Sequence, residues 1–503
     1  MITASIHSSH MHQRFVRTYA KLRETFVAGD RIAFRPDSHA HSLLVGKLGK
    51  LPILTNDAIY RRSSYQAFTK GRRVGVLRVV READLKNLIW RPQDIVILKT
   101  AVPDISVVSG IISEAFSTPL SHVALRARAW GIPHIGLKNA TARYGGLAGK
   151  VVLLEARSDG YQLRLATKAE VAAWRKKRRK KRKIVLPAAD LATRSLKRLN
   201  GLRATQAGAY GAKTANLGEI MHSKPKGYAV PPGFGVPIVY YAEHMKRHGF
   251  DVRVSKMLAD ARFKKDPVAR KHQLAALRRA IRDASIAPAL LERAWKLAGT
   301  IGGQKGGVFV RSSTNAEDLP GFNGAGLYDT VPNVRSKAQL GVAIRKVWAS
   351  VWNDRAVAER TFFGVDHRGV YAAVLIQVGV NATSAGVLVT ANIRKPAERH
   401  VFTINAQKGL GLRVVEGKTI PEELHVNLRT GRVRVVSQAK DKTMIVFDRR
   451  GGVREVKNKG RGRVVSDAQA LRLAKAAAAR ILSSDSRKAV SFSRLALSSS
   501  LRV

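Results

Sequence analysis

The chain of 503 residues contains no cysteine and few acidic residues. Without cysteine it forms no disulfide and carries out no thiol chemistry. No apolar run reaches the roughly 20 residues that a membrane-spanning helix needs. The N-terminus also lacks the basic and apolar segments of a secretory signal. These absences predict a cytoplasmic protein with no membrane segment.

The scarcity of acid leaves a large excess of positive charge. Against 35 Asp and Glu stand 90 Lys and Arg, which gives a formal net charge of +55. Such a field attracts nucleotides and polyphosphates, and it also binds nucleic acid without sequence preference. The sequence contains no helix-turn-helix, zinc-finger or RNA-recognition pattern. Anionic ligands are therefore expected, and non-specific polyanion binding stays open as a partner class.

A hydrophobic content of 45 % and this length predict a globular protein of two or three domains. One stretch, residues 117–133, has the pattern of a turn that opens a short helix. Thr118 is the expected N-cap, Pro119 suits the first helical position, and Gly131 ends the helix. His122 then lies near unpaired N–H groups and the positive end of the helix dipole, where an anion is stabilised. The alternative is a histidine that only satisfies a hydrogen bond.

Two later stretches are typical of phosphate binding. Residues 208–219 form a glycine-punctuated turn that leads Lys213 into a helix, which brings ammonium and backbone donors to phosphate. Residues 308–330 read as a buried strand carrying Arg311, followed by a glycine-containing loop. An arginine fork suits phosphate oxygens better than a lysine does. A structural ion pair is the alternative for Arg311.

Further elements follow from hydrophobic periodicity. Helical spacing predicts helices over residues 269–281, 289–297, 343–356 and 466–481, and a continuous apolar run predicts a buried strand over 372–380. Between the two halves, residues 175–183 are nine consecutive basic residues. Like charges at this density favour an exposed and extended connection.

These motifs resemble the dikinase family. Residues 119–133 are similar to its mobile phosphohistidine domain, and the likeness extends from about Gly75 to Gly160. The resemblance implies that His122 is phosphorylated. Residues 208–236 and 308–330 resemble the opening and the phosphate-covering loop of the dikinase ATP-binding domain, an ATP-grasp-like fold. The family's catalytic and ATP-contacting positions are matched here by Lys213, Arg311, Gly326, Thr330 and Gln377.

The resemblance implies an α/β multidomain protein in which a swivelling phosphohistidine domain precedes a nucleotide-binding domain. That order is the one found in glucan water dikinase. The expected division is an unassigned segment 1–64, a phosphohistidine domain 65–168, a basic linker 169–200, an ATP-binding domain 201–482 and an atypical tail 483–503.

The implied activity is that of a phosphoenolpyruvate synthase-like dikinase. Such an enzyme uses ATP and Mg²⁺ and passes phosphate through His122 to an acceptor such as pyruvate. The alternatives are a water dikinase with a glucan or another acceptor, and a truncated ATP-binding relic. Residues 482–503 match neither motif that closes dikinase ATP domains, so the sequence names no metal ligand and predicts impaired catalysis. Nothing in it sets the oligomeric state.

Overall fold

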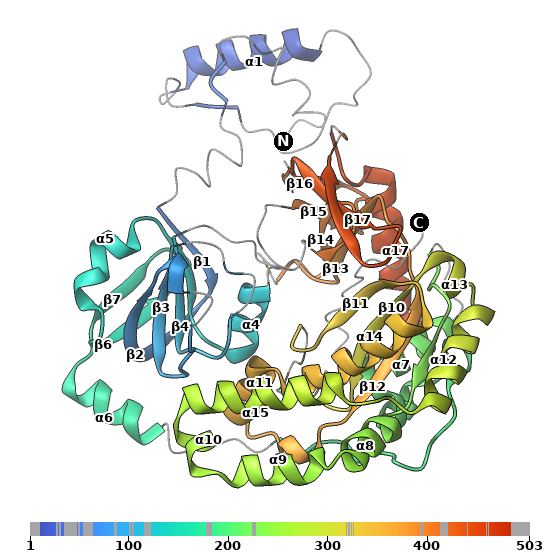
Figure 1. The fold of residues 1–503 in the computed structure, drawn as a ribbon. Helices are drawn as coiled ribbons and strands as arrows, with labels where there is room; N and C mark the ends of the chain where they lie inside the picture. The colour runs from blue at the N-terminus through green and yellow to red at the C-terminus, as the bar shows by residue number, and fades with distance from the viewer. Residues whose placement is uncertain are drawn as a thin grey trace.

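The structure is a computed structural model of the chain. It describes residues 11–26, 29, 32–34, 48, 51–53, 64–84, 88–99, 102, 105–114, 122–177, 184–223, 228–317, 319, 322, 324, 326–392, 395, 397–412, 421–439, 441–458, 460 and 462–483. Helix α1 (Met11–Thr25) comes first and is followed by three units, which we call the N-terminal, central and C-terminal units. Figure 1 shows them together.

The N-terminal unit, residues 64–177, is built on a mixed sheet with the strand order β1-β5-β4-β3-β2-β6-β7. Its strands are β1 (Tyr65–Thr69), β2 (Gly71–Val80), β3 (Asp94–Leu98), β4 (Gly110–Ser113), β5 (His134–Leu137), β6 (Val151–Ala156) and β7 (Tyr161–Leu165). Strands β2, β3, β4 and β5 run parallel to one another. Every residue of β3 is buried, as expected for a central parallel strand.

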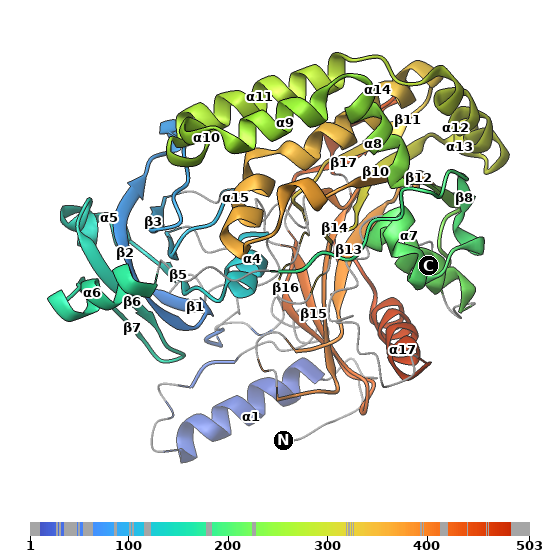
Figure 2. The same ribbon diagram turned by 90° about the horizontal axis from the view of Figure 1, so that it is seen from below.

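The helices of this unit are α4 (His122–Trp130), α5 (Ala140–Tyr144) and α6 (Lys168–Lys177). Helix α4 ends as predicted, because Gly131 takes a left-handed φ of 62° directly after Trp130. The predicted N-cap Thr118 lies outside the described residues. Val123, Ala127 and Trp130 belong to a buried cluster that continues into the central unit. Figures 1 and 2 both place α4 on the side of the N-terminal sheet that faces α15.

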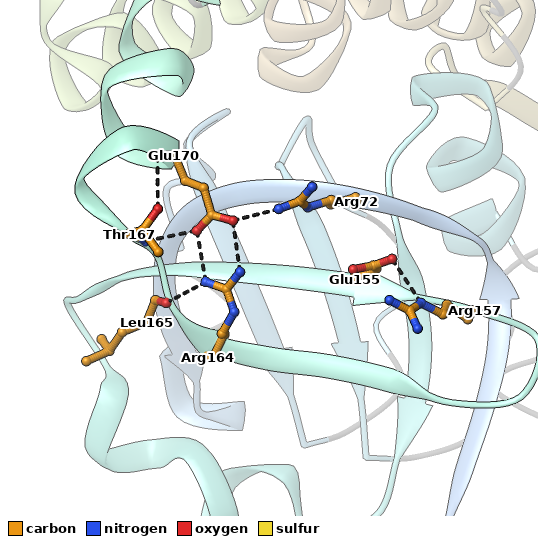
Figure 3. Close-up of polar contacts among 7 residues, drawn as sticks. All are labelled: Arg72, Glu155, Arg157, Arg164, Leu165, Thr167 and Glu170. Atoms are coloured by element: carbon orange, nitrogen blue, oxygen red, sulfur yellow. Dashed lines mark hydrogen bonds and ion pairs between the residues drawn. The ribbon is translucent and has the colours of Figure 1, made fainter.

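Helix α6 is anchored to the sheet by Glu170 (Figure 3). Its carboxylate accepts two hydrogen bonds from Arg164 on β7, of 2.8 and 2.9 Å, and one of 2.6 Å from Arg72 on β2. The Arg164 guanidinium and the Thr167 N–H hold the pKa of Glu170 well below its usual range. Thr167 and Glu170 also form a reciprocal capping pair at the start of the helix. The first residues of the predicted linker are therefore a helix packed on the sheet.

The far end of that linker is packed as well. Ile184 forms a parallel bridge with Val365, and Leu186 and Leu196 pack against the core of the central unit. Of the predicted basic connection, residues 178–183 lie outside the described residues. The described flanks thus attach one end of the run to the N-terminal unit and the other end to the central unit.

The central unit holds an antiparallel sheet with the strand order β11-β10-β12-β9-β8. The strands are β8 (Lys197–Arg198), β9 (Gly233–Val236), β10 (Val308–Thr314), β11 (Thr330–Val334) and β12 (Ala372–Val378). The helices are α7 (Ala207–His222), α8 (Ile238–Arg247), α9 (Phe250–Ala259), α10 (Ala261–Lys265), α11 (Pro267–Asp283), α12 (Pro288–Thr300), α13 (Gly303–Gly306), α14 (Lys337–Ala349) and α15 (Asp354–Phe363). The predicted strands that carry Arg311 and Gln377 are β10 and β12.

The predicted helices 269–281 and 289–297 are confirmed as α11 and α12. The single helix predicted over 343–356 is wrong, because α14 ends at Ala349 and a 3₁₀ turn separates it from α15. Tertiary contacts account for the break. The Trp352 indole donates a 2.9 Å hydrogen bond to the Tyr241 hydroxyl, and the Asn353 amide bonds the Leu327 carbonyl at 3.2 Å.

The C-terminal unit is an antiparallel sheet in the order β13-β14-β15-β16, covered on one face by α17, as Figure 2 shows. Its elements are β13 (Ser384–Val389), β14 (Val401–Lys408), β15 (Glu422–Asn427), β16 (Val433–Ser437), the hairpin β17 (Thr443–Phe447) and β18 (Val453–Lys457), and α17 (Asp467–Ser483). Helix α17 confirms the helix predicted over 466–481. The hairpin reaches back to the central sheet, where Phe447 packs on Phe309 with ring centroids 5.6 Å apart.

Candidate functional site

The site begins at a kink in α7. Gly211 has a φ of 75°, and a Cβ there would lie 2.1 Å from the Ser313 carbonyl oxygen, so glycine is required for two reasons. Ser313 of β10 closes the kink: the Thr214 N–H donates to its hydroxyl at 2.9 Å, and the hydroxyl donates to the Tyr210 carbonyl at 2.9 Å. The kink brings Lys213, on the next turn, against the end of β10.

Lys213 is held at this position by two contacts. Its Nζ donates to the Ser312 carbonyl at 2.6 Å and lies 3.2 Å from Oε1 of Glu317. The Lys213 side chain keeps 30 % of its surface exposed, whereas the Glu317 side chain keeps 6 %. The ammonium group is therefore held by the protein, while part of the Lys213 side chain remains exposed.

Arg311 is the second cation of the cluster. It lies on β10, opposite Thr330 of β11 and Leu375 of β12. Burial lowers the pKa of its guanidinium, and the nearby Glu317 carboxylate opposes this shift. Lys213 and Arg311 are thus both attracted to the Glu317 carboxylate. Lysine and arginine side chains held close together suit an anionic ligand with several oxygen atoms.

Thr330 and Gln377 lie on the same face of the sheet as Arg311. Directly opposed residues in antiparallel strands point to one face, and Thr330 opposes Arg311 while Gln377 opposes Phe309, two residues away. The Gln377 side chain is buried and donates to the Pro231 carbonyl at 3.1 Å. The structure therefore brings four of the predicted residues, Lys213, Arg311, Thr330 and Gln377, to the side of the sheet that α7 covers.

Gly326 and His122 are placed differently. Gly326 has a φ of 71°, and its carbonyl accepts hydrogen bonds from Arg355 and, at 3.0 Å, from Arg126. His122 is the first described residue of α4, on the N-terminal unit. Arg126 lies on the same helix, so α4 touches the loop that precedes Thr330. The helix that begins with His122 therefore contacts a loop whose end, at Thr330, pairs with Arg311.

Sequence reasoning missed two buried polar residues, Glu317 beside Lys213 and Asn405 on the C-terminal sheet. Glu317 follows β10 within the stretch already singled out, so an acidic residue shortly after a phosphate-type arginine was the available signal. Asn405 on β14 had no such signal. Its side chain is buried, and within the described part of the chain its amide nitrogen and oxygen have no hydrogen-bond partner. It opposes Glu423 across the sheet, on the face away from α17.

The donor sets can be compared with the expected ligands. Lys213 and Arg311 suit the phosphates of a nucleotide, because the two cations both lie near the Glu317 carboxylate. Mg²⁺ bound with a nucleotide usually keeps several waters and is held by one or two carboxylates together with the phosphates. Among the described residues, no group of three or more His, Asp and Glu side chains is placed to hold a metal ion by itself. The described residues thus form no all-protein metal cage, which Mg²⁺ bound with ATP does not require.

These features fit an α/β protein that takes an anionic ligand such as a nucleotide, with Lys213 and Arg311 at a corner between a kinked helix and a strand. Comparison with known families agrees. Residues 208–481 match the AMP/ATP-binding domain of pyruvate phosphate dikinase, which is more than half of the chain. The chain belongs to this family, and the predicted dikinase membership is confirmed. The match begins at residue 208, so the resemblance of residues 65–168 to a phosphohistidine domain stays a prediction.

Several phosphoenolpyruvate synthases are similar in sequence to this chain. The probable phosphoenolpyruvate synthase of Staphylothermus marinus is 35 % identical over 249 residues, covering 48 % of this chain and 29 % of that protein. The phosphoenolpyruvate synthases of Pyrococcus furiosus and Neisseria meningitidis are each 31 % identical over 271 residues, covering 47 % and 51 % of this chain and 33 % and 34 % of theirs. This chain thus spans about a third of the length of these relatives. In the described part of the chain, no helix is both long and apolar enough to span a membrane.

Proposed function

We propose that this chain is a phosphoenolpyruvate synthase-like dikinase, which moves phosphate from ATP through a phosphohistidine at His122 to an acceptor such as pyruvate. The observation that carries the proposal is the contact of α4 with the loop of Gly326, beside the Lys213–Arg311 cluster. The family to which the chain belongs has an AMP/ATP-binding domain. Helix α4, which begins with His122, contacts the loop of Gly326 in that domain.

The roles of the residues follow from their surroundings. When bound, ATP would supply the phosphoryl group. Lys213 and Arg311 would hold its phosphate oxygens and offset the charge that develops on them, which is the largest contribution a protein makes to phosphoryl transfer. Glu317 would keep both cations in place through the ion pair with Lys213 and the attraction to Arg311. His122 would be the nucleophile, through an unprotonated ring nitrogen.

The proposal is tested by isotope labelling. A dikinase keeps the β-phosphate on histidine, whereas an ordinary kinase transfers the γ-phosphate. ATP labelled on the β-phosphate should therefore leave acid-labile, base-stable label on the wild-type chain. His122→Ala should abolish the label and retain calorimetric ATP binding, because Lys213 and Arg311 lie on another unit. Label that persists in His122→Ala, or a wild-type chain that takes none, would contradict the proposal.

Two alternatives to this proposal are each favoured by one observation. A water dikinase with a glucan or other acceptor is favoured by the order of the units, with His122 ahead of Lys213. An ATP-binding relic is favoured by residues 482–503, which match neither motif that closes dikinase ATP domains. A relic would bind ATP with Lys213 and Arg311 and release no AMP, which a chromatographic AMP assay distinguishes. Magnesium use and a cytoplasmic location stay predictions.

A further inference from the structure

The contact between α4 and the central unit is centred on Arg126. Its guanidinium donates through Nη1 to the Ile105 carbonyl of its own unit, at 2.9 Å. Through Nη2 it donates to the Gly326 carbonyl of the central unit, at 3.0 Å. Arg355 of α15 donates to the same Gly326 oxygen. The planar guanidinium group of Arg126 therefore connects the N-terminal unit to the loop before Thr330 by hydrogen bonds.

Glu359 of α15 provides the other half of the contact. Its Oε1 lies 3.7 Å from Nε of Arg126, which is an ion pair longer than a hydrogen bond. Trp130, one turn further along α4, lies close enough to the Glu359 carboxyl group to lower its pKa. Arg126 therefore contacts the central unit at both Gly326 and Glu359, and these two contacts limit the orientation of α4.

The burial of these charges shows what the contact can contribute. The side chains of Arg126 and Glu359 are exposed by only 6 % and 2 %. Removing two charges from water costs about as much as their attraction returns, so such a pair adds little net affinity. A misaligned arrangement, however, would leave a charge buried without its partner at high cost. The contact therefore selects one orientation of α4 and does not hold the units together strongly.

We propose that Arg126 is a positioning residue, which aligns the histidine-bearing helix with the phosphate site by seating α4 on Gly326 and Glu359. This inference rests on the proposed function, because it takes His122 as the residue that receives phosphate. His122 precedes Arg126 by four residues, so its backbone lies one helical turn, about 6 Å, from this anchor. Because both residues lie on α4, a shift in the position of Arg126 also shifts the backbone of His122. An arginine that only fills the core would have no such effect on transfer.

The first test separates transfer from binding. In the full chain, Arg126→Met should lower the single-turnover rate of β-phosphate labelling at saturating ATP by at least tenfold. The calorimetric Kd for ATP should stay within twofold, because Arg126 does not belong to the cluster of Lys213 and Arg311. Arg126→Lys keeps the charge without the fork and should recover part of the rate. The matched control is Arg143→Met, which removes an exposed arginine from α5 of the same unit and should match the wild type.

The second test measures the seating of α4 without any activity. Because the chain has no cysteine, Ala148→Cys and Ala338→Cys can carry one spin label on each unit without a competing thiol. Both residues are exposed. Pulsed electron resonance should give a narrow distance distribution in the wild-type background and a broader one in Arg126→Met. Glu359→Gln, which preserves side-chain shape, should broaden the distribution from the other side of the contact and serves if Arg126→Met fails to fold.

The outcomes distinguish the two ideas. A labelled wild type with unchanged rate and distance in Arg126→Met and in Glu359→Gln would overturn the role of Arg126 and leave the proposed function standing. A wild type that takes no label refutes the proposed function, and the distance measurement then still decides whether Arg126 seats α4. A broadened distance with an unchanged labelling rate would overturn the positioning role, because seating would not govern transfer.

Discussion

Two buried arginines of this molecule stand beside a glutamate, and they differ in what else reaches them. Arg311 shares Glu317 with Lys213, whose side chain is 30 % exposed. Arg126 shares Glu359 with Arg355, and its fork is already used by two carbonyl groups. In the cluster of Arg311, the neighbouring Lys213 side chain stays partly exposed. In the cluster of Arg126, the guanidinium group already donates to two carbonyl groups of the protein. A buried arginine–glutamate pair therefore indicates a binding site only when a neighbouring donor remains open.

The largest expected effect concerns the kink that creates the open cluster. Gly211→Ala would force a left-handed alanine and a collision with the Ser313 carbonyl, and should cost roughly 2–5 kcal/mol of unfolding free energy. Gly249→Ala is a control for alanine at a positive φ, at a ψ of 18° where Gly211 has 159°. Gly249 has a φ of 65°, and a Cβ there would meet nothing within 4 Å. It should therefore lose only about 1–2 kcal/mol. Equal losses in urea unfolding would show that the contact with β10 contributes nothing.

The next effect separates the two arginines by ligand binding. Lys213→Ala and Arg311→Ala should each weaken ATP binding by about 1.5–3 kcal/mol, the usual cost of a lost charged hydrogen bond. Arg126→Met should leave that affinity unchanged. Calorimetry with circular dichroism as a folding control measures both. Unchanged ATP affinity in both cluster variants would reject the phosphate assignment and remove the difference between the clusters.

A further effect is a pH dependence confined to the closed cluster. Burial raises the pKa of Glu359 to about 7, with Arg126 and Arg355 opposing the shift. A carboxyl group with a raised pKa in the folded state contributes stability below its ordinary pKa and loses it as pH rises to the folded pKa. Unfolding free energy should therefore fall between the ordinary glutamate pKa and about pH 7, by at most about 1.4 kcal/mol per pH unit, and change little above that.

The matched variant for this prediction is Glu359→Gln, which has no proton to release. Its unfolding free energy should vary less over the same range than that of the wild type. Arg126 and Arg355 face the carboxyl group and stay charged throughout, so they add no slope of their own. Identical slopes for the two proteins in chemical unfolding would place the titration elsewhere in the chain.

The comparison also explains where sequence reasoning succeeded. Arg311 and Gln377 lie on strands with continuous apolar neighbours, so local pattern was enough to place them on β10 and β12. Their shared face follows from strand alternation once the pairing is known. The break between α14 and α15 had no local signal. It depends on Trp352 reaching Tyr241, which is more than 100 residues away in the chain.

The sequence by itself determined the elements and the chemical types: a glycine before Lys213, an arginine on a buried strand, a histidine at the start of α4, and family membership through long motifs. These depend on neighbours along the chain, whose geometry is local. Only the tertiary structure decided that Lys213 beside Arg311 stays partly exposed, whereas Arg126 is buried in contacts with the protein. Glu317 and Glu359 look alike in sequence, and their partners come from distant elements. The difference between a ligand site and a docking contact therefore lies in long-range packing, because it sets how much water each charge retains.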